Sequence, residues 1–157
     1  MHKIINFNDN YVGFGISAME QAVEQGLLRG RPWGGTAILV KANLVKLCSE
    51  INTFDRVVTL TIGDVLFINA YMPYDDGSEI ALNELNEILT NVSVIIEESD
   101  TKYHIFGGDL NADLRKISIH ASAINEFLNT YKIKSVNNTI LNNDIVYTYS
   151  NSKFTIV

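Results

Sequence analysis

The stretch RVVTLTIGDVLFINAYMP, residues 56–73, decides the fold. Apolar and polar residues alternate on both sides of the Gly63-Asp64 pair, and many of the apolar residues are β-branched or aromatic. Alternation with a period of two is typical of strands that bury one face, and a glycine-aspartate pair between two such runs is a turn signal. The stretch therefore predicts two antiparallel strands joined by a tight hairpin.

Two amphipathic segments follow the hairpin and predict helices. In residues 78–98, and again in residues 118–133, apolar side chains recur at helical spacing while polar side chains fill the other positions. Between these segments, KYHIF at residues 102–106 predicts a buried strand that ends at Gly107. The helix residues expected to face inward are Ile80, Leu82, Leu85, Ile88, Leu89, Val92, Ile95, Ile119, Ile124, Phe127 and Leu128.

The remaining segments carry weaker patterns. The residues before the glycine-rich loop at 30–35 contain many turn-forming types and are expected to be irregular, apart from a short helix over residues 17–26. After the loop, TAILV at residues 36–40 predicts a buried strand, because the run is short and β-branched at its ends. Residues 144–157 predict two short strands around a turn.

The order of these elements and the composition define the class of protein. Strands interleaved with helices predict an α/β or α+β fold, and a length of 157 residues fits one domain, residues 1–157. Hydrophobic residues make up 46% of the chain and charged residues 19%, which is typical of a folded globular protein. The formal net charge of -6 would repel DNA unless basic side chains gather locally or a bound cation offsets the carboxylates.

The single cysteine and the lack of long apolar runs in the sequence bear on where in the cell the protein is expected. Cys48 cannot form an internal disulfide, and its apolar surroundings predict a core residue rather than a nucleophile. No apolar run is long enough to cross a bilayer, so we expect no membrane association. Since no secretory leader is apparent either, we expect an intracellular protein, nuclear or cytoplasmic.

The segment HIFGGDLNADL, residues 104–114, carries the candidate chemistry. Asp109 and Asn111 follow a predicted strand and two glycines, so their side chains would emerge at the end of a sheet, where functional sites are often assembled. A carboxylate there can take a proton from water or bind a divalent cation, and an amide can orient water or donate to a phosphate oxygen. The pair suits metal-assisted hydrolysis of a phosphate ester. The alternative interpretation is an ordinary turn, in which the same residue types dominate.

Four motifs occur in an order that resembles the endonuclease/exonuclease/phosphatase superfamily. They are RPWGGTAILV (residues 31–40), INAYMP (68–73), GGDLN (107–111) and YTYSNSKFTIV (147–157). Together with NYVGFGISAM, they are most similar to the apurinic-type endonuclease domain of non-LTR (LINE-type) retrotransposons. The resemblance implies part of a four-layer α/β sandwich, in which helices flank two β-sheets, with DNA as the partner and Mg²⁺ as the cofactor.

The resemblance also implies roles for individual residues. Tyr71 would contact the scissile phosphate, Asp109 would bind the metal and align or deprotonate the attacking water, and Asn111 would hydrogen-bond water or phosphate. Thr148 would support the site. On residue type alone, Tyr71 could equally be an aromatic residue that packs at a strand end, and Thr148 suits an ordinary strand position.

The resemblance is incomplete at both ends of the chain. The superfamily is implied to use an asparagine and a metal-binding glutamate from early strands, and an aspartate and an Asp-His pair near the C-terminus, none of which has a counterpart here. The candidate substitutes are expected to be solvated carboxylates or histidines without metal-ligand partners. These candidates are Glu20, Glu24, Asp113, His104 and His120.

Three expectations follow from the incomplete resemblance. We expect weak or no Mg²⁺ binding and a chain that is inactive as it stands, because a single carboxylate and an amide are too few ligands for a hard cation. An incomplete sandwich would also expose strand edges and apolar faces. Two alternatives stay open: a non-catalytic protein-binding module that keeps the fold, and a phosphatase of the same superfamily that acts on a small phosphoester or a lipid head group.

Overall fold

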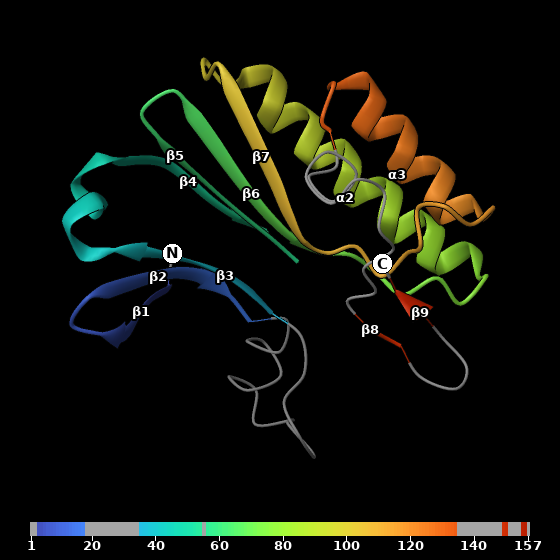
Figure 1. Cartoon of the computed structure of the whole chain (residues 1–157), viewed down its shortest axis with the longest axis horizontal. Helices are drawn as coiled ribbons and strands as arrows, with labels where there is room; N and C mark the ends of the chain where they lie inside the picture. Colours follow the sequence, from blue (N-terminus) through green and yellow to red (C-terminus); the bar gives the residue numbers. More distant parts are fainter. Residues whose placement is uncertain (1–2, 18–34, 55, 135–148, 151–154, 157) are drawn as a thin grey trace. The chain divides into compact units, whose positions relative to one another are not determined.

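A computed structural model describes residues 3–17, 35–54, 56–134, 149–150 and 155–156. The chain divides into two compact units, the first made of Met1–Tyr71 and Ile95–Asp109, and the second of Met72–Val94 and Leu110–Val157. Strands and helices follow one another along the chain (Figure 1). The predicted mixed α/β class is therefore confirmed.

The first unit contains two β-sheets. One is antiparallel and has the order β1-β2-β3, with β1 (Lys3–Asn8), β2 (Tyr11–Ile16) and β3 (Thr36–Lys41). The other has the order β4-β5-β6-β7, with β4 (Cys48–Phe54), β5 (Val57–Ile62), β6 (Val65–Tyr71) and β7 (Tyr103–Asp109). A 3-10 helix, η1 (Ala42–Leu47), lies between β3 and β4 in the sequence.

The β5–β6 hairpin confirms the prediction for residues 56–73. The two strands are antiparallel, and their register runs from the Ile62–Val65 pair at the turn to the Val57–Ala70 pair at the far end. Gly63 in the turn has φ +57°, a left-handed conformation that glycine adopts without steric cost. β6 and β7 run parallel instead, and the connection between them contains a helix, as parallel pairing requires.

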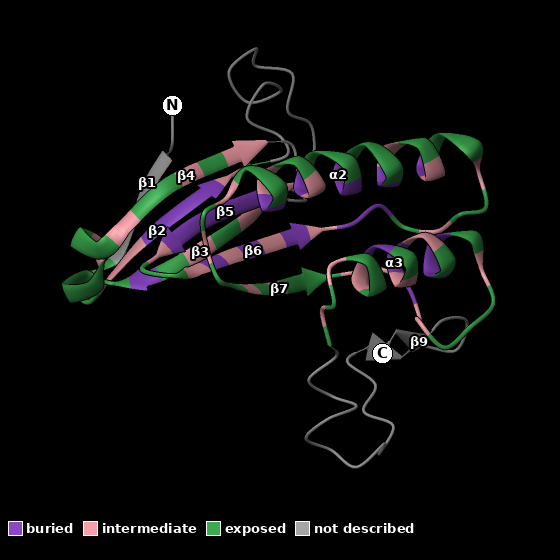
Figure 2. Cartoon of the chain, turned by 90° about the horizontal axis from the view of Figure 1, so that it is seen from above, coloured by how far each residue is buried: buried purple, intermediate pink, exposed green. Residues whose placement is uncertain are grey.

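The core of the first unit lies between its two sheets. Phe14 and Val40 of one sheet and Val58 and Leu60 of the other are buried in a single cluster. Figure 2 shows β5 buried along its length, as expected for an inner strand with both faces covered. Burial of these apolar side chains is the main term that stabilises the sheet pair.

Two strands predicted to be buried are less buried than expected. In β3 (Thr36–Lys41) only Val40 is fully buried, and neighbouring side chains alternate between half-buried and exposed. β7 is the last strand of its sheet, and its Tyr103 and Ile105 side chains are 55% and 53% exposed. The prediction failed because an apolar run reports hydrophobicity and not the position of a strand within its sheet.

The prediction of an irregular N-terminal region is wrong for residues 3–16, which form the β1–β2 hairpin. The turn between the strands is closed locally, since the backbone N–H of Asn10 donates to Asn8 Oδ1 at 2.8 Å. The glycines of β2 mark a close approach and not a turn: a Cβ on Gly15 would lie 2.8 Å from Ala37 Cβ on β3. Glycine in a strand often has this meaning.

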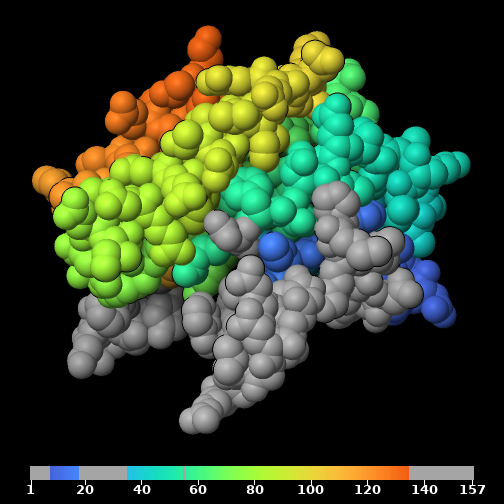
Figure 3. Space-filling view, turned by 180° about the vertical axis from the view of Figure 1, so that it is seen from behind, coloured from blue at the N-terminus to red at the C-terminus, as the bar shows by residue number. Residues whose placement is uncertain are grey.

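Helices α2 (Glu79–Glu98) and α3 (Ile119–Thr130) confirm the two predicted helices. Both begin after a serine whose Oγ accepts a backbone N–H of the first turn, at 3.1 Å for Ser78 and 3.0 Å for Ser118. Such caps satisfy helix N–H groups that have no intrahelical partner. The exposed side of α2, rich in glutamate and asparagine, reaches the surface as yellow-green atoms in Figure 3.

The inward faces of the helices differ from the prediction at their first residues. Ile80 and Ile119 are 80% and 68% exposed, whereas Ala81 and His120, one position later, are buried. One residue turns a helix by about 100°, so the position after each isoleucine continues the buried stripe. Leu85, Ile88, Leu89, Val92, Ile124 and Phe127 are buried as predicted, while Leu82, Ile95 and Leu128 are partly buried.

The second unit also contains the two short C-terminal strands. β8 (Tyr149–Ser150) and β9 (Thr155–Ile156) pair antiparallel, which confirms the two strands predicted in residues 144–157. Residues 18–26 of the predicted helix, most of the glycine-rich loop, and the residues Glu20, Glu24 and Thr148 lie outside the described residues. Among the helices that the structure describes, none has the length and apolar character needed to cross a membrane.

Candidate functional site

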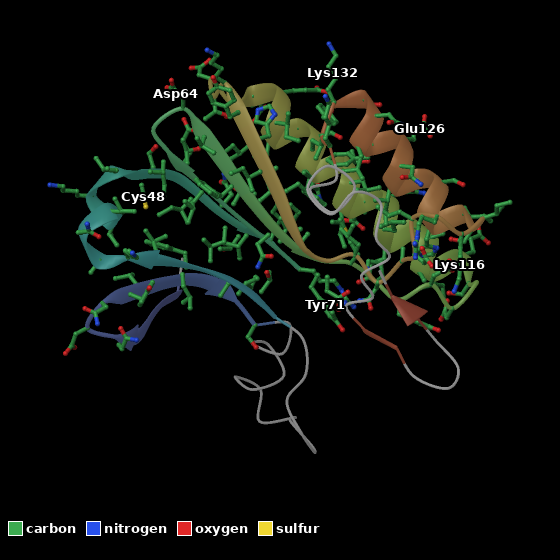
Figure 4. The ribbon with its side chains drawn as sticks, in the orientation of Figure 1. Cys48, Asp64, Tyr71, Lys116, Glu126 and Lys132 are labelled. Carbon is green, nitrogen blue, oxygen red and sulfur yellow. The ribbon has the colours of Figure 1, made fainter. Side chains whose placement is uncertain are left out.

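The ends of β6 and β7 bring two of the predicted site residues together. The strands are parallel, and their register pairs Tyr71 with Asp109 and Asn69 with Gly107. Paired residues of neighbouring parallel strands place their side chains on the same face of the sheet. Tyr71, labelled in Figure 4 at the end of β6, therefore lies next to Asp109, which is exposed at the end of β7.

Gly108 makes this close pairing possible. It has φ +121°, and a Cβ on it would overlap the Ala70 carbonyl oxygen and lie 2.8 Å from the Ala70 carbonyl carbon. Gly107 has open space around the corresponding position. Residues 107–109 continue the strand, so the alternative interpretation of an ordinary turn is wrong for these three residues. The second glycine is required because the backbones of β6 and β7 approach so closely there.

Arg56 adds a cation to the same end of the sheet. Because β5 runs antiparallel to β6, the residue before β5 lies beside the last residue of β6. The Arg56 carbonyl accepts the Tyr71 backbone N–H at 2.9 Å, and the Arg56 guanidinium carbon lies 5.2 Å from the centre of the Tyr71 ring. This distance is typical of a cation–π contact. Arg56 was not predicted as a site residue. The antiparallel register expected on either side of the Gly63-Asp64 turn nevertheless pairs Arg56 with Tyr71.

Asn69 fixes this end of β6 to the other sheet. Its Nδ2 donates to Thr36 Oγ1 at 2.6 Å and to the Ala37 carbonyl at 3.0 Å. Asn69 lies two residues before Tyr71, hence on the same face of β6. The amide therefore links β6 to the start of β3 next to the candidate site. The INAYMP motif contains this residue, but nothing in its spacing indicated a contact between sheets.

Asn111 belongs to the second unit and is held by a backbone carbonyl there. Its Nδ2 donates to the Met72 carbonyl at 2.8 Å, and the side chain is half-buried. Its φ of +49° lies in the left-handed region, which asparagine tolerates better than most residues. Among the predicted site residues Tyr71, Asp109 and Asn111, the Asn111 amide group therefore has a fixed orientation, with its nitrogen on the Met72 carbonyl oxygen.

Asp113 is not the solvated charge that was expected. Its side chain is only 7% exposed and lies 3.4 Å from Arg115 Nε and 3.8 Å from Lys116 Nζ. The carboxylate also accepts the Arg115 backbone N–H at 3.1 Å. The chain turns after Asn111 and brings two cationic residues back to Asp113; Figure 4 labels Lys116 on this loop. The carboxylate closes a loop and is not free for a metal ion.

Cys48 behaves as a packing residue. Its side chain is half-buried against the core cluster of the first unit, and its Sγ lies 3.7 Å from the Leu44 carbonyl oxygen. Burial raises the pKa of the Cys48 thiol above its ordinary value. A raised pKa leaves less of the nucleophilic thiolate at neutral pH. The interpretation of Cys48 as a core residue is therefore confirmed, with less burial than expected.

The described residues do not by themselves fit a magnesium ion. Among them, no group of three or more His, Cys, Asp or Glu side chains could hold a metal ion. Asp109 contributes one exposed carboxylate at the end of β7, whereas Mg²⁺ prefers six oxygen ligands in octahedral array. Asp109 is a candidate ligand within a larger set.

Comparison with known proteins identifies no relative that bears on this site. A scan against protein-family models gives no match, and no curated protein matches the chain either. The family suggested by the four motifs therefore stays a prediction. It rests on the order of the motifs in the sequence.

Proposed function

We propose that the chain carries the phosphate-binding and water-activating residues of a phosphodiester hydrolase of the endonuclease type, with DNA as its substrate. The observation that carries the proposal is the β6–β7 register, which pairs Tyr71 with Asp109 and so puts both residues on the same face of the sheet. The Arg56 guanidinium on the Tyr71 ring adds a positive charge where a phosphate would lie. In the same proposal, the two packed sheets are part of a four-layer sandwich.

Each residue of this site has a definite task. The Tyr71 hydroxyl donates to a non-bridging phosphate oxygen, and Arg56 favours the anion electrostatically. Asp109 takes a proton from water, and the resulting hydroxide attacks phosphorus while the P–O bond to the leaving oxygen breaks and that oxygen takes a proton from solvent. Asn111, the third predicted residue, belongs to the second unit, where its amide nitrogen is fixed on the Met72 carbonyl oxygen. The three side chains of the first unit thus provide an anion site and a base.

A bound Mg²⁺ ion would offset the charge that develops on the phosphate in the transition state. Asp109 is the residue that would contact it. Because one carboxylate holds a hard cation weakly, we expect weak Mg²⁺ binding and little turnover by the chain as it stands. Loss of even one group that stabilises such charge costs on the order of a hundredfold in rate.

The proposal is tested by titrating ¹⁵N-labelled protein, without metal and at low salt, with a short duplex that contains an abasic-site analogue. The amide shifts should concentrate at Arg56, Tyr71 and Asp109, and Arg56→Ala should weaken binding about tenfold. The matched control is Lys102→Ala. Lys102 lies 5.2 Å from the ring of Tyr103, at the opposite end of the same sheet, so its removal should leave the affinity unchanged.

Two outcomes would decide against this assignment. Equal losses in the two variants would show that binding follows overall charge and not the site. Shifts spread over other surfaces would place the DNA elsewhere. A nicking assay on supercoiled and abasic DNA with Mg²⁺ complements the titration: turnover that disappears in Asp109→Ala would support the function and contradict the expected inactivity.

One observation favours a second candidate, a non-catalytic protein-binding module. Tyr103 and Ile105 expose large apolar side chains on β7, the last strand of its sheet. Edge strands with exposed apolar residues are common places of protein association. The net charge of -6 also suits a protein partner better than DNA. Failure of the duplex to shift any resonance at low salt would favour this candidate.

A further inference from the structure

Two contacts in the second unit, one hydrogen bond and one histidine–carboxylate contact, join the loop after β6 to the segment after β7. Asn111 Nδ2 donates to the Met72 carbonyl at 2.8 Å. Farther along, His120 Nδ1, near the start of α3, lies 3.1 Å from Asp75 Oδ1 in the loop before α2. All four residues belong to the second unit. The first contact holds Asn111, for which the motifs predict a catalytic role, and the second contact has no role assigned so far.

The surroundings of the His120 side chain favour one of the two neutral tautomers of its ring. Its side chain is 3% exposed, and its Nε2 is buried without a hydrogen-bond partner among the described residues. The carboxylate of Asp75 accepts hydrogen bonds but cannot donate one when ionised. Of the two neutral tautomers, the one protonated on Nδ1 therefore suits this contact. A proton on Nε2 instead would leave a buried N–H unpaired and set a lone pair against the carboxylate.

Asp75 is itself held in place by the turn before α2. The same Oδ1 accepts the backbone N–H of Gly77 at 3.2 Å, and Gly77 has φ +77°. The next carboxylate, Asp76, accepts the Ser78 N–H at 2.9 Å, and Ser78 caps α2. The carboxylate that meets His120 therefore belongs to a hydrogen-bonded turn just before the capped start of α2. Contact with it fixes the start of α3 to the start of α2.

We propose that His120, as its Nδ1–H tautomer, and Asp75 form a clamp that positions Asn111. Asn111 has a left-handed backbone, which persists only where surrounding contacts hold it. Its hydrogen bond to Met72 joins two connecting segments, and the clamp fixes the same two segments at a second point. With the clamp intact, the Asn111 amide stays on the Met72 carbonyl. The part that concerns catalysis rests on the proposed function, while the clamp itself does not.

Two substitutions at one position test the clamp. In His120→Asn, the amide nitrogen can occupy the place of Nδ1 and donate to Asp75. In His120→Gln, the amide nitrogen reaches toward the place of Nε2, and the bond to Asp75 is lost. The readout is solvent exchange of the Asn111 side-chain NH₂ in ¹⁵N spectra, with its resonance assigned by its absence in Asn111→Asp. We expect exchange to quicken about tenfold in His120→Gln and little in His120→Asn.

A control separates positioning from general stability. Ser118→Ala removes the cap of α3, whose Oγ accepts the Ala121 N–H at 3.0 Å, but leaves the clamp residues in place. It should lower the melting temperature without quickening exchange at Asn111. If exchange instead follows stability in every variant, or if His120→Gln leaves it unchanged, the clamp is wrong.

The tautomer is measured on the unmodified protein, so the inference stays testable if a variant fails to fold. Long-range ¹H–¹⁵N spectra of the imidazole should show a protonated Nδ1, and a neutral ring protonated on Nε2 would overturn the proposal. The DNA titration tests the function separately. If the clamp is present but the protein does not bind DNA, the clamp proposal stands and the proposed function is refuted. If the protein binds DNA but exchange at Asn111 does not change in His120→Gln, the proposed function stands and the clamp is refuted.

Discussion

Replacing Gly108 with alanine tests the geometry that brings β6 and β7 together at the candidate site. The added methyl group would overlap the Ala70 carbonyl oxygen and lie 2.8 Å from both the carbonyl carbon and the amide nitrogen of Ala70. Backbone atoms of a paired strand cannot rotate away as a flexible side chain can. The ends of the two strands must therefore separate, which breaks the pairing of Tyr71 with Asp109.

The expected loss of stability has two parts. Alanine at φ +121° is strained by about 1–3 kcal/mol, and forcing a methyl group into occupied space costs about 1–3 kcal/mol more. The sum of about 2–6 kcal/mol is a large fraction of the stability of an ordinary domain, about 5–15 kcal/mol. Urea denaturation followed by circular dichroism measures this change.

Gly107→Ala is the matched control for Gly108→Ala. A Cβ on Gly107 meets no atom within 4 Å, and the Gly107 backbone lies outside the left-handed region. Alanine there should be neutral or slightly stabilising, because glycine weakens strands by about 0.5–1 kcal/mol. Equal effects of the two substitutions would refute the close approach at Gly108, and with it the reason for the two-glycine motif.

Three further predictions concern the sheet contact, the helix core and acid stability. Asn69→Leu should destabilise the first unit by about 1–3 kcal/mol in urea denaturation, because Thr36 and the Ala37 carbonyl lose their donor; an unchanged midpoint would dismiss the contact. Leu85→Ala should cost about 2–5 kcal/mol, because Leu85 is fully buried, whereas Val94→Ala on the exposed side of α2 should cost far less; similar melting temperatures for the pair would contradict this. Hydrogen bonds from the Ser78 side chain and backbone lower the pKa of Asp76. The stabilisation from Asp76 is therefore complete above the ordinary aspartate value of 3.8 and lost as the pH falls through the lower folded value. Asp76→Asn should flatten this part of a melting-temperature profile against pH, and an unaltered profile would speak against it.

Local patterns predicted the elements that local forces determine. The hairpin over residues 56–73 and the helices α2 and α3 were predicted from periodicity and a turn dipeptide, which involve residues close in sequence. The predictions were wrong where one residue type occurs in more than one structural setting. Gly15 marks the close approach of β2 to β3 and not a loop. Ile80 is apolar but precedes the buried stripe of its helix.

The candidate site was predicted in part. The motifs singled out Tyr71, Asp109 and Asn111, and the register of β6 and β7 places the first two side by side. Asn69 was missed because an asparagine within a strand has no distinctive spacing, and Arg56 was missed although the predicted turn at Gly63-Asp64 pairs it with Tyr71. The strand pairing in the structure shows which residues lie next to Arg56 and Asn69. Their contacts with Tyr71 and Thr36 depend on which strands lie next to each other.

The sequence by itself determined the mixed α/β class, the tight hairpin, the helix starts and the acid-amide pair after two glycines. Only the tertiary structure decided that Tyr71 meets Asp109, that Asn111 binds the Met72 carbonyl and that His120 meets Asp75. Each of these pairs joins segments on either side of α2, brought together by the parallel crossover. Such contacts depend on the packing of the whole chain, because parallel pairing places distant residues together and leaves no periodic trace in the sequence.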